Sequence, residues 1–217
     1  MESPLASASR RLAARVTAPL PEAVPSGSRR LILETALRLF AERGYSGTSI
    51  RDIAAACGLQ GPTIYSHYPS KEHVLAELVR IAHEEHLRRL RAALLESQPD
   101  PREQMQAWVR AHVRFHTDFP MLAVVGNTEL HMLSPALGDP IFQVRKQGEE
   151  ILMHIAQRGI DRGLFKVPHA WLAVAAIGGM GLRVAFWFSA DAGIAAETVA
   201  DSYAEFALRI LAAAGKD

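Results

Sequence analysis

Residues 28–71 read SRRLILETALRLFAERGYSGTSIRDIAAACGLQGPTIYSHYPSK, and this stretch decides the fold. In its first third, apolar residues such as Leu33, Leu37 and Phe40 recur at helical spacing, while charged residues take the opposite side. Gly44 follows, and a glycine at this point favours a left-handed end to a helix. This part of the stretch therefore predicts an amphipathic helix that ends at a glycine.

Two shorter helices are expected after the next turn. Ser49 and Asp52 stand three residues apart, which is the spacing of a capping box. Gly58 ends this second helix after about two turns, and Pro62 suits the first turn of a third helix, because that turn needs no amide hydrogen. Two short helices joined by three or four residues form a helix-turn-helix, whose second helix enters the major groove of DNA. We therefore expect residues 28–72 to be a DNA-binding domain.

The same block resembles the N-terminal domain of the tetracycline-repressor (TetR) family of transcriptional regulators. The resemblance is carried by Phe40-Ala41-Glu42-Arg43-Gly44-Tyr45, Thr48-Ser49-Ile50 with Ile53-Ala54, Gly58-Leu59, Pro62-Thr63-Ile64-Tyr65 with His67-Tyr68, and Ser70-Lys71-Glu72. It departs from the family at Gln60, where a Ser or Thr cap is common. The resemblance implies a ligand-responsive regulator, a repressor that binds a near-palindromic DNA operator as a homodimer.

Polar and small residues of this block are the candidate DNA contacts. Base edges are in reach of Gln60, Gly61, Pro62, Thr63 and Ser66, and phosphate oxygens suit Ser49, Tyr65, His67 and Lys71, while Arg51 could serve either purpose. The alternative for Tyr65 and Tyr68 is packing within the small domain. Ile64 is assigned to the core.

The positive charge is concentrated in the same stretch. Residues 28–71 carry six basic and three acidic side chains, a net charge of +3, whereas the whole chain of 217 residues carries +1. A basic excess at the expected DNA-binding surface suits phosphate contacts, and the small total charge favours a few placed contacts. With 49% hydrophobic residues, the chain has enough apolar side chains for this domain and a larger one.

Residues 1–27 are rich in Ala, Ser, Pro and Arg and contain no long apolar run. We expect a flexible leader and no secretory signal. Its Arg10, Arg11 and Arg15 form either a solvated tail or a basic arm that touches a neighbouring groove. Cys57, the single cysteine, is expected in the core, and its lack of a disulfide partner favours the reducing cytoplasm.

Beyond residue 72 the pattern is helical throughout, so we expect an all-α protein of about nine helices. A long helix from Ser70 to Glu96 should connect the DNA-binding domain to a helical ligand-binding and dimerisation domain over residues 73–217. Further helices are expected near residues 102–118, 120–132, 140–163, 168–190 and 193–214.

Two sets of residues in this larger domain are candidate sites. The ligand-binding candidates are aromatic, apolar or polar side chains of its middle part: Trp108, Phe115, Phe119, Leu122, Asn127, His131, Arg145, Met153, Arg183 and Trp187. The dimerisation candidates, which would form a four-helix bundle with a second copy, are Trp171, Gly178, Leu182, Val199, Tyr203, Phe206 and Ile210. For the apolar members of the ligand-binding set, plain core packing is the alternative. The run from Phe115 to Arg145, together with Ala185-Phe186-Trp187-Phe188, also resembles TetR relatives that sense acyl-CoA or steroid-derived acids.

The sequence gives weaker indications of other classes of function. The segment from Trp171 to Ala190 approaches the length of a membrane span, but Arg183 lies within it, and a buried oligomer interface is equally apolar. His112 and His116 stand four apart as in some metal sites, without a third ligand, and His83 and His86 are expected on a solvated face. No phosphate loop or catalytic motif is present, so neither an enzyme nor a cofactor is expected. A helical adaptor and an all-α enzyme remain the alternatives.

Overall fold

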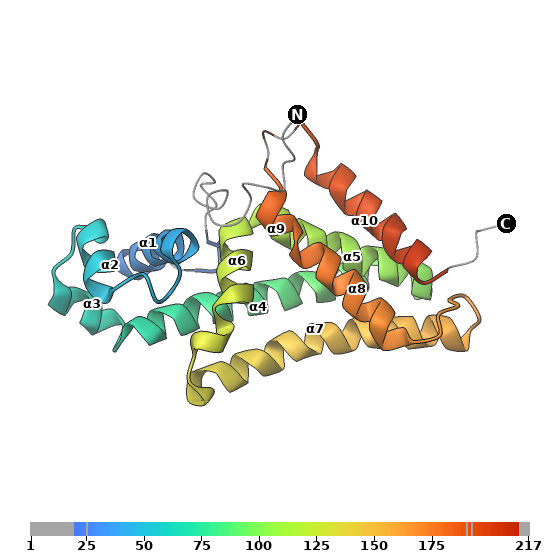
Figure 1. Cartoon of the computed structure of the whole chain (residues 1–217), viewed down its shortest axis with the longest axis horizontal. Helices are drawn as coiled ribbons and strands as arrows, with labels where there is room; N and C mark the ends of the chain where they lie inside the picture. The colour runs from blue at the N-terminus through green and yellow to red at the C-terminus, as the bar shows by residue number, and fades with distance from the viewer. Residues whose placement is uncertain (1–19, 25, 190, 192, 213–217) are drawn as a thin grey trace. The chain divides into compact units, whose positions relative to one another are not determined.

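The structure is a computed structural model that describes residues 20–24, 26–189, 191 and 193–212. Within these residues the secondary structure is helical and contains no strand, which confirms the all-α prediction (Figure 1). The chain forms two compact units. Of the described residues, the first unit contains those up to Glu85, Phe119–Phe142 and Ala185–Trp187. The second contains His86–Asp118, Gln143–Val184 and the described residues from Phe188 onward.

The first unit contains the helix-turn-helix. Its helices are α1 (Ser28–Arg43), α2 (Ile50–Cys57), α3 (Gly61–His67), the first part of α4 (Lys71–Glu96), α6 (Pro120–Thr128), the short 3₁₀ helix η2 (Leu130–Met132) and the start of α7 (Pro135–Asp161). α1 contacts both α2 and α6. Three residues join α2 to α3, as the sequence predicts. The unit is therefore larger than the expected domain of residues 28–72, since α6 and the start of α7 belong to it.

The core of the first unit is built from the apolar faces of these helices. Phe40, Ile53 and Ile64 are fully buried, one from each of the first three helices. Where α6 meets α4, Gly126 permits a close approach, because a Cβ atom at this position would lie 2.8 Å from the Cβ of Ala82. The small residue thus sets how closely α6 packs on α4.

The second unit centres on α5 (Pro101–Asp118). α8 (Ala170–Leu182) and α10 (Ala196–Ile210) both contact α5, and they also contact each other. Phe165 is buried against Gly159 of α7, where any larger residue would overlap its ring. The backbone N–H of Lys166 donates to the carbonyl oxygen of Leu211 and ties the α7–α8 connection to the end of α10.

Several predicted helix ends differ from the structure. A single helix was expected over residues 168–190, but the structure has two helices there, α8 and α9 (Val184–Trp187). Arg183 lies between them. Glycines in the last turns of α8 lower its helix propensity ahead of that break. α7 begins at Pro135, before the expected residue 140, because a proline suits the first helical position, and Pro140 lies inside the helix.

The two glycine stops also differ from each other. Gly58 adopts the left-handed conformation, with φ 66° and ψ 23°. Gly44 has φ 74° but ψ 166°, so it ends α1 with a positive φ and not with the left-handed helical turn that was expected. Both positions nevertheless require the conformational freedom of glycine.

The described part of the expected leader is packed. Leu20, Pro21 and Val24 are buried, and the guanidinium of Arg30 on α1 donates to the carbonyl oxygens of Leu20 and Val24 over 2.8 and 2.7 Å. The prediction of a flexible segment up to residue 27 was therefore wrong for this part, because one arginine satisfies its backbone oxygens. The three arginines of the proposed basic arm lie outside the described residues.

One segment among the described residues, Ala170–Trp187, is long and apolar enough to cross a membrane by length and composition. The core helix of a soluble protein passes the same test. Here α8, which makes up most of the segment, contacts α5 and α10. The segment therefore gives only weak support to the membrane alternative.

Candidate nucleic-acid interface

The N-terminus of α2 is fixed by a complete capping box. The backbone N–H of Asp52 donates to the Ser49 hydroxyl over 3.1 Å, and the backbone N–H of Ser49 donates to the Asp52 carboxylate over 2.7 Å. The Ser49 hydroxyl also donates to this carboxylate, over 2.6 Å. These hydrogen bonds lower the pKa of Asp52. Because the Ser49 hydroxyl proton is already used, a contact to phosphate would have to exchange that bond.

The exposed face of α3 carries most of the predicted base contacts. Gln60, Pro62, Thr63, Tyr65, Ser66 and His67 are all exposed, while Ile64 beneath them is fully buried. Gln60 stands at the N-cap without a side-chain cap, so its amide is not used to start the helix. The Ser66 hydroxyl donates to the carbonyl of Thr63 over 2.7 Å. The exposure of these side chains is what DNA contact requires, and the contacts themselves stay predictions.

The two tyrosines of this region have different environments. Tyr65 is 53% exposed, whereas Tyr68 is only 3% exposed. The Tyr68 hydroxyl accepts from Arg29 Nε over 3.1 Å, and the pKa of Tyr68 is raised by burial. The packing alternative therefore holds for Tyr68, and Tyr65 remains available to a ligand.

An ionic network joins α1 to the helix that follows the helix-turn-helix. Arg29 of α1 donates to Glu77 of α4 over 3.2 Å, and Arg80 on the same face of α4 donates to Glu77 over 3.0 Å and to Glu84. Together with the bond from Arg29 to Tyr68, this network connects α1, the end of α3 and α4. This network therefore helps to fix the orientation of α3 relative to α1 and α4.

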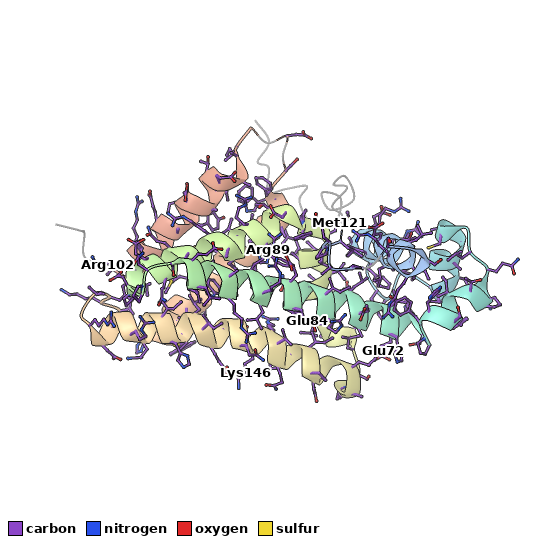
Figure 2. The ribbon with its side chains drawn as sticks, turned by 180° about the vertical axis from the view of Figure 1, so that it is seen from behind. Glu72, Glu84, Arg89, Arg102, Met121 and Lys146 are labelled. Carbon is purple, nitrogen blue, oxygen red and sulfur yellow. The ribbon has the colours of Figure 1, made fainter. Side chains whose placement is uncertain are left out.

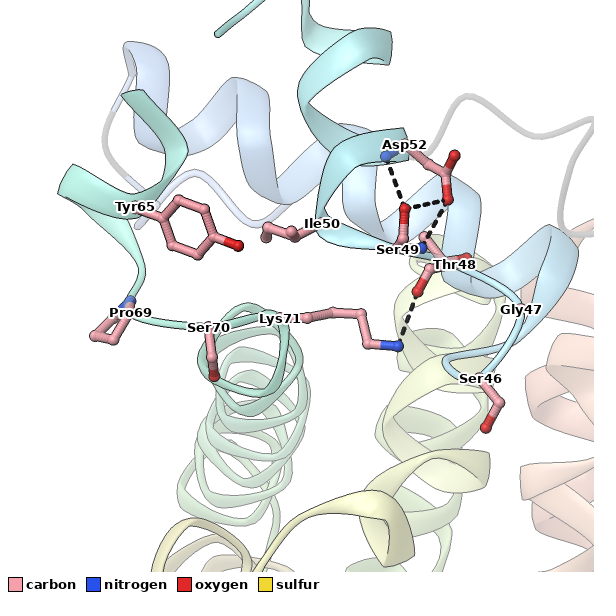
Figure 3. Close-up of a pocket in the computed structure, with 10 residues that line it drawn as sticks. All are labelled: Ser46, Gly47, Thr48, Ser49, Ile50, Asp52, Tyr65, Pro69, Ser70 and Lys71. Atoms are coloured by element: carbon pink, nitrogen blue, oxygen red, sulfur yellow. Dashed lines mark hydrogen bonds between the residues drawn. The ribbon is translucent and has the colours of Figure 1, made fainter. Parts of the chain in front are cut away.

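Lys71, a predicted phosphate contact, is bound within the protein. Its ammonium donates to the carbonyl oxygen of Thr48 over 2.8 Å (Figure 3). It also donates to the carbonyl oxygen of Tyr45 over 2.9 Å and lies 3.9 Å from the centre of the Tyr45 ring. Burial lowers the pKa of Lys71. Two of its three N–H groups therefore hold the α1–α2 loop (residues 44–49), and a phosphate contact would use the third.

Two further residues shape this loop. The Thr48 hydroxyl lies within hydrogen-bonding distance of the carbonyl oxygens of Leu39 and Gly44, at 3.3 and 3.0 Å. At Gly47 a Cβ atom would lie 2.4 Å from the carbonyl oxygen of Arg43, so only glycine fits. The loop that leads into α2 is thus held from α1 and from α4.

An open depression of about 620 Å³ lies beside this loop (Figure 3). It is lined by Ser46, Gly47, Thr48, Ser49, Ile50, Asp52, Tyr65, Pro69, Ser70 and Lys71. Three of these, Ser49, Tyr65 and Lys71, are predicted contacts. Loop residues 46–48 were not predicted as contacts from the sequence, because they lie between two helices and outside the pattern of either. The position of the depression at the start of α2 suits a strand of the DNA backbone.

Cys57, at the end of α2, is half-buried, whereas the sequence predicted that it would lie in the core. Its thiol lies 3.8 Å from the carbonyl oxygen of Leu31 on α1. Arg51, on the first turn of α2, is exposed. α2 thus turns an apolar side with Ile53 and Ala54 toward the core and leaves Arg51 in solvent.

The predicted ligand-binding residues divide between the two units. In the first unit, Phe119 and Leu122 are buried, Asn127 and Trp187 are half-buried and His131 is exposed; in the second, Trp108 and Phe115 are buried, Arg145 and Met153 are half-buried and Arg183 is exposed. Arg145 also forms an ion pair with Glu149 on its own helix. The exposed His131 and Arg183 do not have the enclosed position that a polar anchor needs, and the set as a whole stays a prediction.

Buried histidines in the second unit form a hydrogen-bonded chain. His112 Nε2 lies 3.0 Å from the carbonyl oxygen of Gly178, which can only accept, so His112 carries its proton on Nε2. His112 Nδ1 then accepts from His86 Nε2 over 2.9 Å, and His116 Nδ1 donates to the backbone carbonyl of His112 over 2.7 Å. Trp108 stacks on the His112 ring.

The burial of these rings contradicts the expectation that His83 and His86 lie on a solvated face. His83 is buried and His86 is half-buried, so neither lies on a fully solvated face. Across the described residues, no group of three His, Cys, Asp or Glu side chains could hold a metal ion. Burial lowers the pKa of His112 well below its usual value and that of His116 to about 4, so both rings are neutral at pH 7.

The predicted dimerisation residues are divided between surface and core. Trp171 is 62% exposed, and Phe206 and Ile210 are also exposed, while Gly178, Leu182 and Tyr203 are half-buried. Val199 is buried within the second unit, so its place in an interface was predicted wrongly: helical spacing alone could not tell the α5-facing side of α10 from its outer side. The other six leave an apolar surface on α8 and α10.

A capped helix-turn-helix with an exposed second helix, followed by a helical remainder, defines a DNA-binding transcriptional regulator. Comparison with known proteins agrees. The family model "Bacterial regulatory proteins, tetR family" matches residues 32–78, and "Tetracyclin repressor-like, C-terminal domain" matches residues 98–211. The chain therefore belongs to the TetR family; it is a ligand-responsive DNA-binding regulator and not an enzyme.

Three relatives extend over most of the chain. The transcriptional repressor KstR2 of Rhodococcus jostii is 25% identical over 200 residues, which are 86% of this chain and 92% of the relative. A tetR-family regulatory protein from Rhodococcus RHA1 is 30% identical with a TM-score of 0.80, over 88% of this chain and all of that one. AibR, solved with isovaleryl coenzyme A and operator DNA, is 25% identical with a TM-score of 0.74, over 82% of this chain and 96% of that one.

Proposed function

We propose that the protein is a homodimeric repressor that binds a near-palindromic DNA operator and is released by a small hydrophobic effector. The observation that carries the DNA-binding part is the exposed face of α3, where Gln60, Pro62 and Thr63 stand above a fully buried Ile64. Their amide, hydroxyl and apolar groups are of the kinds that read base edges in the major groove. The capped N-terminus of α2 beside them suits the phosphate backbone.

The apolar surface of α8 and α10 supports the proposed homodimer. Exposed Trp171, Phe206 and Ile210 form a surface that a soluble protein usually covers. Two copies related by a twofold axis would cover it with a four-helix bundle. Two α3 helices about one turn of DNA apart, roughly 34–36 Å, would then meet two half-sites.

The effector is proposed from relatives and from the composition of the predicted ligand-binding set. AibR is solved with isovaleryl coenzyme A, and KstR2 of Mycobacterium tuberculosis is described as a ketosteroid transcriptional regulator. The predicted set here combines aromatic and apolar side chains with a few polar ones, as does a site for a largely hydrophobic acid. An acyl-CoA or a steroid-like acid is therefore the proposed class, acting in the cytoplasm.

Selection of DNA from a random pool tests the proposal. The full-length protein is expected to enrich an inverted repeat whose binding weakens steeply with salt. Thermal shift with panels of acyl-CoA thioesters and steroid acids then finds the effector, since a ligand at a hundred times its Kd stabilises by about 2.7 kcal/mol. Failure to enrich any sequence would refute the operator, and enrichment of single half-sites would refute the dimer.

A further inference from the structure

Glu72, beside Lys71 on the first turn of α4, binds a segment that is remote in sequence. Its Oε1 accepts from the backbone N–H of Ser134 over 2.8 Å (Figure 2 labels Glu72). Both residues lie in the first unit. Ser134 immediately precedes α7, and its carbonyl accepts the first helical bond, from the N–H of Gly138.

The bond meets a need that the chain cannot satisfy locally. The first N–H groups of a helix have no partner within it, and a carboxylate is stabilised by the positive end of the helix. Pro135 follows Ser134 and supplies no N–H of its own. Glu72 therefore caps α7 from a different helix, and hydrogen bonds from Ser134 lower the pKa of Glu72.

The same turn of α4 holds the loop that leads into α2. Lys71 donates to the carbonyl oxygens of Tyr45 and Thr48, next to the Ser49 cap. Burial and the negative charge of Glu72 raise the pKa of Tyr45. Adjacent residues on one helical turn thus bind the start of α7 and the start of the DNA-binding surface.

We propose that Glu72 is a positioning residue for operator binding: by fixing the first turn of α4 on the first turn of α7, it sets where Lys71 holds the α1–α2 loop. This inference rests on the proposed operator binding by α2 and α3. It assigns no contact between Glu72 and DNA.

Charge and position give opposite predictions for this residue. If Glu72 acted only through its negative charge near a DNA-binding surface, Glu72→Ala and Glu72→Gln would both strengthen binding. If it positions α4, Glu72→Ala weakens binding, roughly two- to thirtyfold. Glu72→Gln keeps an oxygen that accepts from Ser134 and stays within about twofold of the parent protein.

The partner residue offers a test without any change of charge. Ser134→Pro removes the N–H that donates the hydrogen bond to Glu72. Leu133, with φ −83° and ψ 142°, has the extended conformation that suits a following proline. This variant should weaken binding as Glu72→Ala does. Because the two substitutions break one bond, the double variant should be no weaker than the weaker single variant. Glu96→Ala, an exposed carboxylate at the other end of α4, is the matched control.

Two measurements on the full-length protein decide the matter. The first is the anisotropy of a fluorescein-labelled duplex that the parent protein selected from a random pool, titrated at several salt concentrations. The salt slope should stay unchanged in Glu72→Ala, because no phosphate contact is lost. The second is amide hydrogen exchange over residues 45–52 without DNA, which should be faster in Glu72→Ala and Ser134→Pro and unchanged in Glu96→Ala.

The outcomes separate this proposal from the proposed function. If the parent protein selects no DNA, operator binding fails, while the exchange measurement still decides the role of Glu72. Unchanged exchange in both Glu72→Ala and Ser134→Pro overturns the positioning role. Tighter DNA binding by Glu72→Ala and Glu72→Gln alike overturns it also, in favour of charge. If Glu72→Ala proves unfolded by circular dichroism, Ser134→Pro and Glu72→Gln carry the same decision.

Discussion

His112 Nε2 lies 3.0 Å from the carbonyl oxygen of Gly178, and the bond exists because the residue about one turn later on α8 is also a glycine. A Cβ atom on Gly181 would lie 2.2 Å from Cδ2 of the His112 ring. The imidazole therefore occupies the space that a side chain would fill. α5 and α8 are joined by a buried polar group that fits only beside glycine.

We expect Gly181→Ala to destabilise the fold by about 1–3 kcal/mol, because the ring of His112 must move and its hydrogen bond weakens. Gly179→Ala is the matched control on the same helix, since a Cβ atom there meets nothing within 4 Å. It should be neutral or raise stability by up to about 1 kcal/mol through helix propensity. Urea unfolding at one protein concentration measures both, and equal effects would contradict the packing described.

Acid should destabilise the protein through the buried histidines. Burial lowers the folded-state pKa of His116 to about 4 and that of His112 well below 6.5. The unfolded chain binds protons below about pH 6.5, so stability is complete above this pH and is lost as the pH falls toward 4. His116 alone should contribute a loss on the order of 3 kcal/mol across this window.

Unfolding free energies at pH 7.5, 6 and 5 measure that dependence. In His116→Gln the fall between pH 7.5 and 5 should be smaller than in the parent protein, because one buried group no longer titrates. His154→Gln, at an exposed position on α7, should leave the fall unchanged. An equal pH dependence in all three proteins would show that the burial of His116 has no such consequence.

Substitutions at two residues near the DNA-binding surface should weaken operator binding in different ways. Gln60→Ala should relax the choice of base at one position, at a cost of about 1–3 kcal/mol for the preferred base, with little change in melting temperature. Lys71→Ala should weaken all sequences about equally and also lower the melting temperature, since two carbonyl oxygens of the α1–α2 loop lose their donor. Binding to a panel of single-base operator variants compares them. Equal losses on every sequence for both would remove Gln60 from the base contacts.

Phe206→Glu on the outer side of α10 should give a monomer, because a carboxylate would be buried without a partner in the proposed bundle. Leu95→Glu is the control: Leu95 is 87% exposed at the end of α4 and belongs to no predicted interface. Sedimentation velocity measures the state of each, and operator affinity should fall with the loss of the dimer. A dimer that survives Phe206→Glu would place the interface elsewhere.

The helix-turn-helix could be predicted from the sequence because its signals are local. The Ser49–Asp52 capping box, the left-handed Gly58 and Pro62 in the first turn of α3 all lie within a few residues of the helix ends that they determine. The side of each helix that is buried follows from the same short-range spacing, as Ile64 and Ile53 show.

The sequence could not predict contacts made by backbone atoms or by distant helices. Lys71 binds carbonyl oxygens, which every residue possesses, so no residue type marks its partners. The bond from Glu72 joins residues 62 positions apart. Val199 was predicted to lie in the dimer interface, because helical spacing defines the faces of a helix but not which element covers each face. In the structure Val199 is buried and α10 packs on α5.

The hydrogen bonds from Arg30 to Leu20 and Val24 determine where an isolated DNA-binding fragment would have to begin. Removal of the residues before Ser28 would remove the buried side chain of Leu20. It would also leave the guanidinium of Arg30 without its carbonyl acceptors. A proteolytic cut between Leu20 and Ser28 should loosen α1. The boundary that matters for a fragment therefore lies at least eight residues upstream of the first helix.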